Sequence, residues 1–250
     1  IGPSLFEFKG TAYDIHNYVD VATKSDRHKA SLILRKQNFY TESTVYPWIS
    51  EADLDISLLD DVRDYIRATN SSHPWLKLSN SELMKAARLY CRDPFSGKYG
   101  FNLASVVLLG HENTILDLLP VYRTDVVVKL SYEKRYDDRI VCKSNLVRSY
   151  VQIIAFCSKW LPDSFILEGN QRISARDVLL REVICNWLIH REVTSAKIST
   201  IEIDSEGIHT RNANNCLFEG AINPNNLEPT PKNPIIANFF NQMGFAEELG

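Results

Sequence analysis

Residues 180–192, LREVICNWLIHRE, predict a helix that is apolar almost all the way round its axis. Ser174 is a suitable N-cap for this helix, because a serine oxygen can accept hydrogen bonds from the free amides of the first turn. Glu182, Asn186 and His190 recur at four-residue intervals and fall within a sector roughly 80° wide. A helix with so few polar positions has to pack against other elements. We therefore expect this polar seam not to face bulk water along its whole length.

Two interpretations of the polar seam remain open from the residues alone. A carboxylate framed by apolar neighbours needs a partner, since an unpaired buried charge is costly. In the first interpretation, Glu182 binds an arginine of residues 172–177 and His190 hydrogen-bonds a nearby carbonyl, so that the seam is structural. In the second, Glu182 is a general base or orients a water molecule, and Asn186 is an oxygen ligand for a hard cation such as Mg²⁺.

The other elements follow from apolar spacing and alternation. The run FNLASVVLLG at 101–110 is interpreted as a buried strand. Residues 197–212 alternate around the turn DSEG and predict a hairpin in which Gly207 takes a positive φ. The remaining predictions are helices at 51–70, 79–91, 145–160 and 235–249, strands at 124–133 and 135–141, β-like runs at 30–35 and 38–49, and a polar loop at 212–234.

These elements predict an α+β fold in a chain that is long enough to bury a sizeable core. A small helical region at residues 51–95 leads into an α/β sandwich, in which the helix at 174–191 packs on an antiparallel sheet. The chain starts without methionine, and we expect it to be part of a longer protein.

The composition of the chain argues against several classes of protein. The five cysteines are scattered and never spaced as Cys-x-x-Cys, so neither a disulfide framework nor a zinc site is expected. A net charge of -3 gives no overall attraction to nucleic acid. No apolar run approaches the roughly 20 residues of a membrane span, and no signal peptide is recognisable at the start. We expect a cytoplasmic protein that does not bind membranes.

An ordered series of motifs covers most of residues 39–250. It contains Arg181-Glu182, Asn186 and His190-Arg191-Glu192, then a hairpin, and then a loop that ends in Lys232-Asn233-Pro234. Upstream motifs are FYTEST (39–44), HPWLKLSNSELM (73–84), GFNLASVVLLG (100–110), PVYRTDVVVKL (120–130), YDDR (136–139) and FILEGNQRIS (165–174). In this order the chain resembles the bacterial RecG-related transcriptional regulators. Their C-terminal module is similar to the GHKL-type ATP-binding domain of gyrase, heat-shock chaperones, histidine kinases and MutL.

The resemblance implies a domain organisation. Residues 1–50 correspond to the tail of an N-terminal AlbA-like (Schlafen-type) domain, which is thought to bind DNA in whole members of the family. Residues 51–95 would form a helical linking region, and residues 96–250 a GHKL-type α/β sandwich. DNA would then be bound by the missing N-terminal part of the parent protein, and a homodimer is a further expectation.

The resemblance also implies a site for ATP and Mg²⁺. Glu182 takes the place of the catalytic carboxylate, and Asn186 that of the magnesium ligand and of a cofactor contact. Four further residues would lie near the nucleotide: His190, Arg191, Asn212 and Lys232.

The sequence departs from the family pattern after the hairpin. Residues 212–216, NANNC, stand where an Asp-x-Gly-x-Gly segment would bind adenine. No Gly-x-x-x-x-Gly-Lys phosphate-binding loop occurs anywhere in the chain. We therefore expect a nucleotide-binding-like regulatory portion of a DNA-binding transcriptional regulator, with a degenerate ATP site or no cofactor at all. The alternatives are a non-catalytic interaction or dimerisation module and an active ATP hydrolase.

Overall fold

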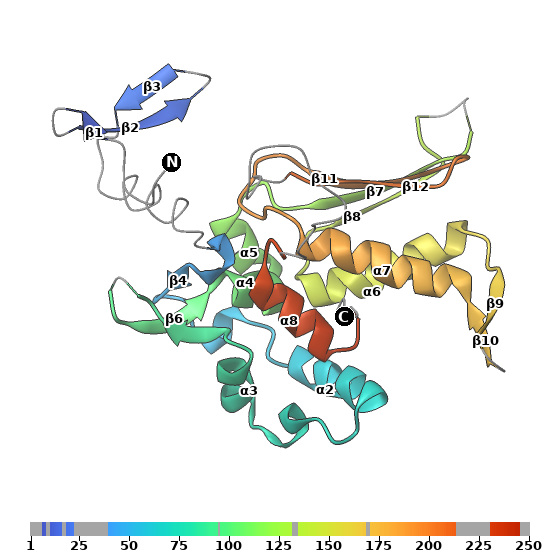
Figure 1. Cartoon of the computed structure of the whole chain (residues 1–250), viewed down its shortest axis with the longest axis horizontal. Helices are drawn as coiled ribbons and strands as arrows, with labels where there is room; N and C mark the ends of the chain where they lie inside the picture. The colour runs from blue at the N-terminus through green and yellow to red at the C-terminus, as the bar shows by residue number, and fades with distance from the viewer. Residues whose placement is uncertain are drawn as a thin grey trace, which may run out of the picture.

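The structure is a computed structural model with an α+β fold (Figure 1). It describes residues 40–94, 96–131, 135–168, 171–213 and 231–245, together with the backbone of 7–8, 11–16 and 19–22; of Glu168 and Gln171 only the backbone is described. The first three strands, β1 (Glu7–Phe8), β2 (Thr11–His16) and β3 (Val19–Ala22), form an antiparallel sheet in that order. The predicted β-like run at 30–35 and most of the predicted loop at 212–234 lie outside the described residues.

A four-stranded sheet forms one layer of the C-terminal half. Its strands are β7 (Thr124–Lys129), β8 (Asp138–Cys142), β11 (Ser199–Asp204) and β12 (Ile208–Arg211), in the order β12-β11-β7-β8. The two outer pairs are antiparallel, but β11 runs parallel to β7. The predicted antiparallel sheet is therefore mixed. Parallel neighbours need a long crossover, which the helices between β8 and β11 supply.

Two long helices, α6 (Leu146–Trp160) and α7 (Ala175–Ile189), lie along one face of this sheet (Figure 1). Asn145 caps α6 and Ser174 caps α7, each accepting a hydrogen bond from the amide three residues on. Strand β11 alternates buried and half-buried positions, and Gly207 has a φ of 145° in the turn after it. The predicted helices and the predicted hairpin are confirmed in this region.

A short hairpin that the sequence did not reveal joins α6 to α7. Strands β9 (Phe165–Glu168) and β10 (Gln171–Ser174) pair only with each other among the described strands. The hairpin extends from the ends of the two helices, away from the four-stranded sheet (Figure 1).

The N-terminal half adds a helical layer with a small sheet. Strands β4 (Val45–Tyr46), β6 (Tyr99–Asn102) and β5 (Tyr90–Arg92) pair antiparallel in the order β4-β6-β5. This sheet joins residues on both sides of positions 50 and 95, where the sequence predicted boundaries. The helical segments are η1 (Thr41–Ser43), η2 (Glu51–Asp53), α2 (Leu58–Thr69), η3 (Pro74–Lys77), α3 (Asn80–Ala86) and α5 (Glu112–Leu118).

The predicted buried strand at 101–110 is wrong. Residues Leu103–Leu109 form helix α4, and every one of them is buried. Asn102 starts the helix, since its Oδ1 accepts a hydrogen bond from the Ser105 amide at 3.0 Å. A short run that is apolar on all sides has no periodicity, so the sequence pattern cannot distinguish a buried helix from a buried strand.

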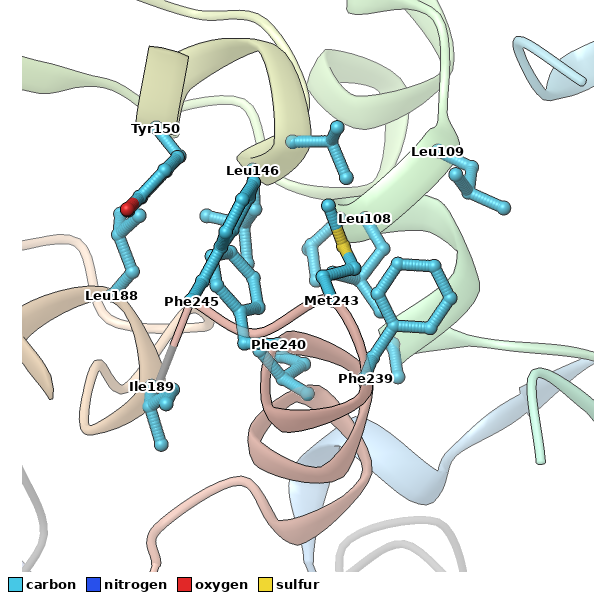
Figure 2. Packing of buried hydrophobic residues seen from close by; sticks show 14 of the residues in the cluster. Leu108, Leu109, Leu146, Tyr150, Leu188, Ile189, Phe239, Phe240, Met243 and Phe245 are labelled. Atoms are coloured by element: carbon cyan, nitrogen blue, oxygen red, sulfur yellow. The ribbon is translucent and has the colours of Figure 1, made fainter. Parts of the chain in front are cut away.

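Helix α8 (Pro234–Gln242) joins the two halves of the core. Phe239 and Phe240 are fully buried, and the Phe245 ring stacks on that of Tyr150 with centroids 4.1 Å apart. Figure 2 shows these aromatic rings among side chains of α4, α6 and α7. Helix α8 ends earlier than the predicted residue 249, with Gly244 at a φ of 72°. No helix in the described part of the chain has the length and apolar character that crossing a membrane requires.

Candidate functional site

Glu182 and Asn186 lie side by side on the solvent-facing side of α7. The Asn186 Nδ2 donates a hydrogen bond to the Glu182 Oε1, and both residues are exposed. Two of the three seam residues therefore face solvent, and only His190 is half-buried. Two apolar neighbours of the seam are exposed as well, Val178 at 36% and Leu179 at 52%, whereas Ile189 is buried. No other described element covers the face of α7 on which these exposed residues lie.

His190, the third residue of the polar seam, terminates α7. Its amide donates a hydrogen bond to the Asn186 carbonyl at 3.0 Å, and its side chain is half-buried. Burial lowers the pKa of His190. The imidazole is therefore neutral at physiological pH, and it contributes no positive charge beside the Glu182–Asn186 pair.

Arg191 is buried behind the end of α7. Its Nη1 donates to the Thr124 Oγ1 at 3.0 Å, and its Nη2 donates to the Arg123 carbonyl at 2.9 Å. The guanidinium also lies 4.5 Å from the centroid of the Tyr122 ring. These contacts attach the end of α7 to the start of β7, so the structure places Arg191 in a scaffold role.

Asn212 follows β12 and faces the last turns of α7. Its Nδ2 donates a hydrogen bond to the Trp187 carbonyl, and the Trp187 Nε1 donates to the Arg211 carbonyl at 3.3 Å. The Asn212 Oδ1 is buried and accepts no hydrogen bond from the residues that the structure describes. Buried polar atoms without a partner are rare, and this enclosed oxygen is one of them among the described residues.

Lys232 forms an ion pair with Glu192, with its Nζ 3.0 Å from the Oε2. Only 11% of the lysine side chain and 5% of the glutamate side chain are exposed. Burial alone would raise the pKa of Glu192, but hydrogen bonds from Thr194 and Lys232 outweigh it, and the pKa lies below its ordinary value. Next to Lys232, the Asn233 Nδ2 donates to the carbonyls of Ile189 and Arg191, both at 2.7 Å.

The six predicted site residues thus fall into two groups. Glu182 and Asn186 form an exposed pair on the middle of α7. Arg191, Asn212 and Lys232 gather with His190 at the carboxyl end of the helix, where they make internal contacts. Asn233 belongs to this second group, and only its place in the Lys-Asn-Pro motif marked it in the sequence. The free carbonyls at the end of a helix require such donors.

A groove of about 510 Å³ lies along the other half of α7. It is bounded by Tyr150 and Ile154 of α6, by Arg172 of β10, and by Val178 and Arg181 of α7. Glu182 and Asn186 do not line it. In addition, the described residues contain no group of three His, Cys, Asp or Glu side chains that could hold a metal ion.

Comparisons with known proteins indicate a similar fold but do not assign an activity. Residues 31–125 match a family described as a domain of unknown function, DUF8451. No curated protein matches the chain. The crystal structure of the DIP2311 protein from Corynebacterium diphtheriae is similar, with a TM-score of 0.58 and 13% sequence identity, over 95% of this chain. The chain spans 46% of that protein. At this identity the likeness concerns the fold alone.

Proposed function

We propose that this chain is the nucleotide-binding-like regulatory portion of a DNA-binding transcriptional regulator, with a GHKL-type sandwich. The observation that supports it is the arrangement along α7. The helix presents a carboxylate and an amide to solvent one turn apart, and the buried, unpaired Asn212 Oδ1 lies at its carboxyl end. The mixed four-stranded sheet with two helices on one face is compatible with such a sandwich.

The donor atoms fit Mg²⁺. The Asn186 Nδ2 is occupied by Glu182, so the Asn186 Oδ1 can face a cation beside the second carboxylate oxygen of Glu182. Hard oxygen ligands suit Mg²⁺, which usually takes one or two protein ligands and completes its shell with phosphate oxygens and water. Magnesium at this pair would neutralise the phosphates of a nucleotide.

Asn212 would recognise the base. Its Oδ1 is enclosed and without a partner among the described residues, so the side chains around it would have to move before it accepts a hydrogen bond from an exocyclic amino group such as that of adenine, in place of the aspartate that the resembling family uses. The fixed Nδ2 bond to Trp187 orients that oxygen. We expect binding without efficient turnover, because Glu182 is engaged by Asn186 and the chain contains no glycine-rich phosphate loop. The nucleotide is then a signal for the regulator.

A thermal-shift titration of the full chain with Mg²⁺ and ATP tests this proposal. A ligand at ten times its dissociation constant stabilises the fold by about 1.4 kcal/mol, which is a Tm increase of roughly 3 to 5 °C at this size. We expect Asn186→Ala and Asn212→Ala to abolish the shift. Asn113→Ala, which alters an exposed asparagine on α5, is the matched control. An absent shift, or one that Asn186→Ala leaves unchanged, contradicts nucleotide binding at α7.

A second candidate, a dimerisation module, is favoured by a separate observation. Exposed apolar side chains lie along β9 and near the start of α7: Phe165 (53%), Ile166 (50%), Leu167 (71%), Val178 and Leu179. We call this set the hairpin patch. On the strand, Phe165 and Leu167 share one face and Ile166 lies on the other. Because β9 pairs only with β10 among the described strands, its outer edge has free hydrogen-bonding groups. A second copy of the chain could pair with that edge and bury the patch.

A further inference from the structure

A cavity of about 560 Å³ lies between three segments that are distant in sequence, and no residue of α7 lines it. Its walls come from residues 40–43, from the end of α3 with β5, and from the first turn of α8. Glu42 joins two of these walls, since its Oε1 and Oε2 accept hydrogen bonds from the amides of Ile235 at 2.6 Å and Ile236 at 3.0 Å. The volume is in the range of small-molecule sites.

The charged side chains at this cavity are arginines. Arg88 and Arg92 line it, and neither has an ion-pair partner among the residues that the structure describes. The Arg92 Nε donates to the Gly97 carbonyl at 2.9 Å, which fixes the side chain and leaves its terminal nitrogens available. The carboxylate of neighbouring Asp93 accepts from the Ser96 amide at 3.0 Å, within its own turn. Both oxygens of Glu42 are likewise occupied by amides.

Arg88 is held in an unfavourable backbone conformation. Its φ is 59°, and it is the single non-glycine residue with a positive φ in the described part of the chain. It follows α3 in a Schellman arrangement, in which the Arg88 amide donates to the Lys85 carbonyl and the Leu89 amide donates to the Met84 carbonyl. Glycine usually occupies this position, because a Cβ is strained there.

Buried Asn102 holds Arg88 in place. The Asn102 Nδ2 donates to the Arg88 carbonyl at 2.8 Å. The fold therefore keeps a long cationic side chain at a position where glycine would be more stable. Strain of this kind concentrates at functional sites, and here it occurs in the wall of a cavity.

From this coincidence we propose that the cavity binds a small organic anion, whose phosphate or carboxylate is held by Arg88 and Arg92. A guanidinium binds such oxyanions with charge-assisted hydrogen bonds. The apolar part of the ligand packs against Ile235 and Pro234, while Tyr40 and Ser43 offer hydroxyl groups. The start of α8 forms part of this wall. A bound ligand would therefore contact a helix that also packs in the core. The site is independent of the nucleotide proposal.

Isothermal titration of the full chain tests the cavity with three probes: phenyl phosphate, benzoate and, as the neutral control, phenol. We expect one or both anions to bind and phenol not to bind, and the better anion identifies the oxyanion. Arg88→Gly and Arg92→Gln should each weaken the affinity by about tenfold or more. Arg67→Gln, which removes a positive charge from the exposed side of α2, should leave it unchanged.

The Arg88→Gly variant has a second expected result, which separates a functional arginine from a structural one. Its Tm should rise by roughly 2 to 4 °C, because glycine adopts the left-handed conformation without strain. A lower Tm would make Arg88 a structural residue and overturn the proposal. So would an absence of anion binding, equal affinity in Arg88→Gly, or binding that is lost in Asn186→Ala instead.

Discussion

At the scale of single residues, Glu42 is a fully buried carboxylate that no cation neutralises within the described structure. Burial raises the pKa of Glu42 to about 7, although the amides of Ile235 and Ile236 act in the opposite direction. Between its ordinary value of 4.5 and about 7, the folded protein holds a proton that the unfolded chain has released. Stability should therefore fall as the pH rises through this window.

Denaturant unfolding at a series of pH values measures this contribution. We expect the free energy of unfolding to include a decrease on the order of 3 kcal/mol from pH 4.5 to pH 7 that comes from Glu42. Glu42→Gln should remove that part of the slope, because its amide does not titrate. Glu112→Gln, at an exposed position, should retain it. An identical slope in Glu42→Gln would show that other groups cause the pH dependence.

Single residues also show which features of the candidate site could be predicted from the sequence. Spacing of four residues on a helix correctly placed Glu182 next to Asn186, because this geometry is local. Which seam residues are exposed could not be decided from the sequence, since it depends on which face of α7 other elements cover. The contacts of Glu42 and Asn233 could not be anticipated at all, since their partners lie 193 and 44 residues away, respectively.

At the scale of elements, α4 depends on a single polar residue at its start. Asn102 is fully buried and uses both ends of its amide, accepting from Ser105 and donating to the Arg88 carbonyl. It therefore sets the start of α4 and also stabilises the turn after α3. One side chain thus couples a helix start to a helix end, and removing it affects both elements.

Asn102→Ala should lower the free energy of unfolding by about 2 to 4 kcal/mol. The loss of an N-cap costs about 1 kcal/mol, and the partly buried Arg88 carbonyl left without this donor costs roughly 1 to 3 kcal/mol more. Chemical denaturation measures the change, and Asn113→Ala should remain near the wild-type value. A loss below about 1 kcal/mol would mean that water replaces the amide.

Elements with local signals were predicted well from the sequence. Capping side chains and helical spacing gave α6 and α7, and alternation with a glycine turn gave the β11–β12 hairpin. Predictions failed where neighbours decide the conformation. Helix α4 is apolar on all sides, the strands β9 and β10 are four residues long each, and the parallel pairing of β7 with β11 depends on the crossover between them.

At the scale of the whole molecule, the hairpin patch concerns how copies of the chain associate. Several exposed apolar side chains on one short hairpin and the helix beside it are uncommon on a monomer unless they serve an interaction. The patch lies at the outer end of α6 and α7 (Figure 1), and its residues Val178 and Leu179 are one turn from Glu182. A second copy paired there would lie next to the Glu182–Asn186 pair. Dimerisation and nucleotide binding should therefore affect one another.

Sedimentation velocity over a range of protein concentrations tests the association. We expect a dimer that Leu167→Lys converts to a monomer, because the lysine places a charge at the most exposed apolar position of the patch. Leu130→Lys changes an exposed leucine at the end of β7 and should leave the dimer intact. A wild-type chain that remains monomeric at all concentrations would exclude the second candidate function.

The contact between Glu42 and Ile235 also has a consequence for synthesis in the cell, because 193 residues separate them. Ribosomes add roughly 5 to 20 residues per second, so about 10 to 40 s pass between the synthesis of the two partners. From its own synthesis until α8 is made, the apolar segment of α4 has no α8 to cover it. Nascent chains that end before residue 231 should therefore be protease-sensitive and bound by chaperones, and the core should close only once α8 has left the ribosome.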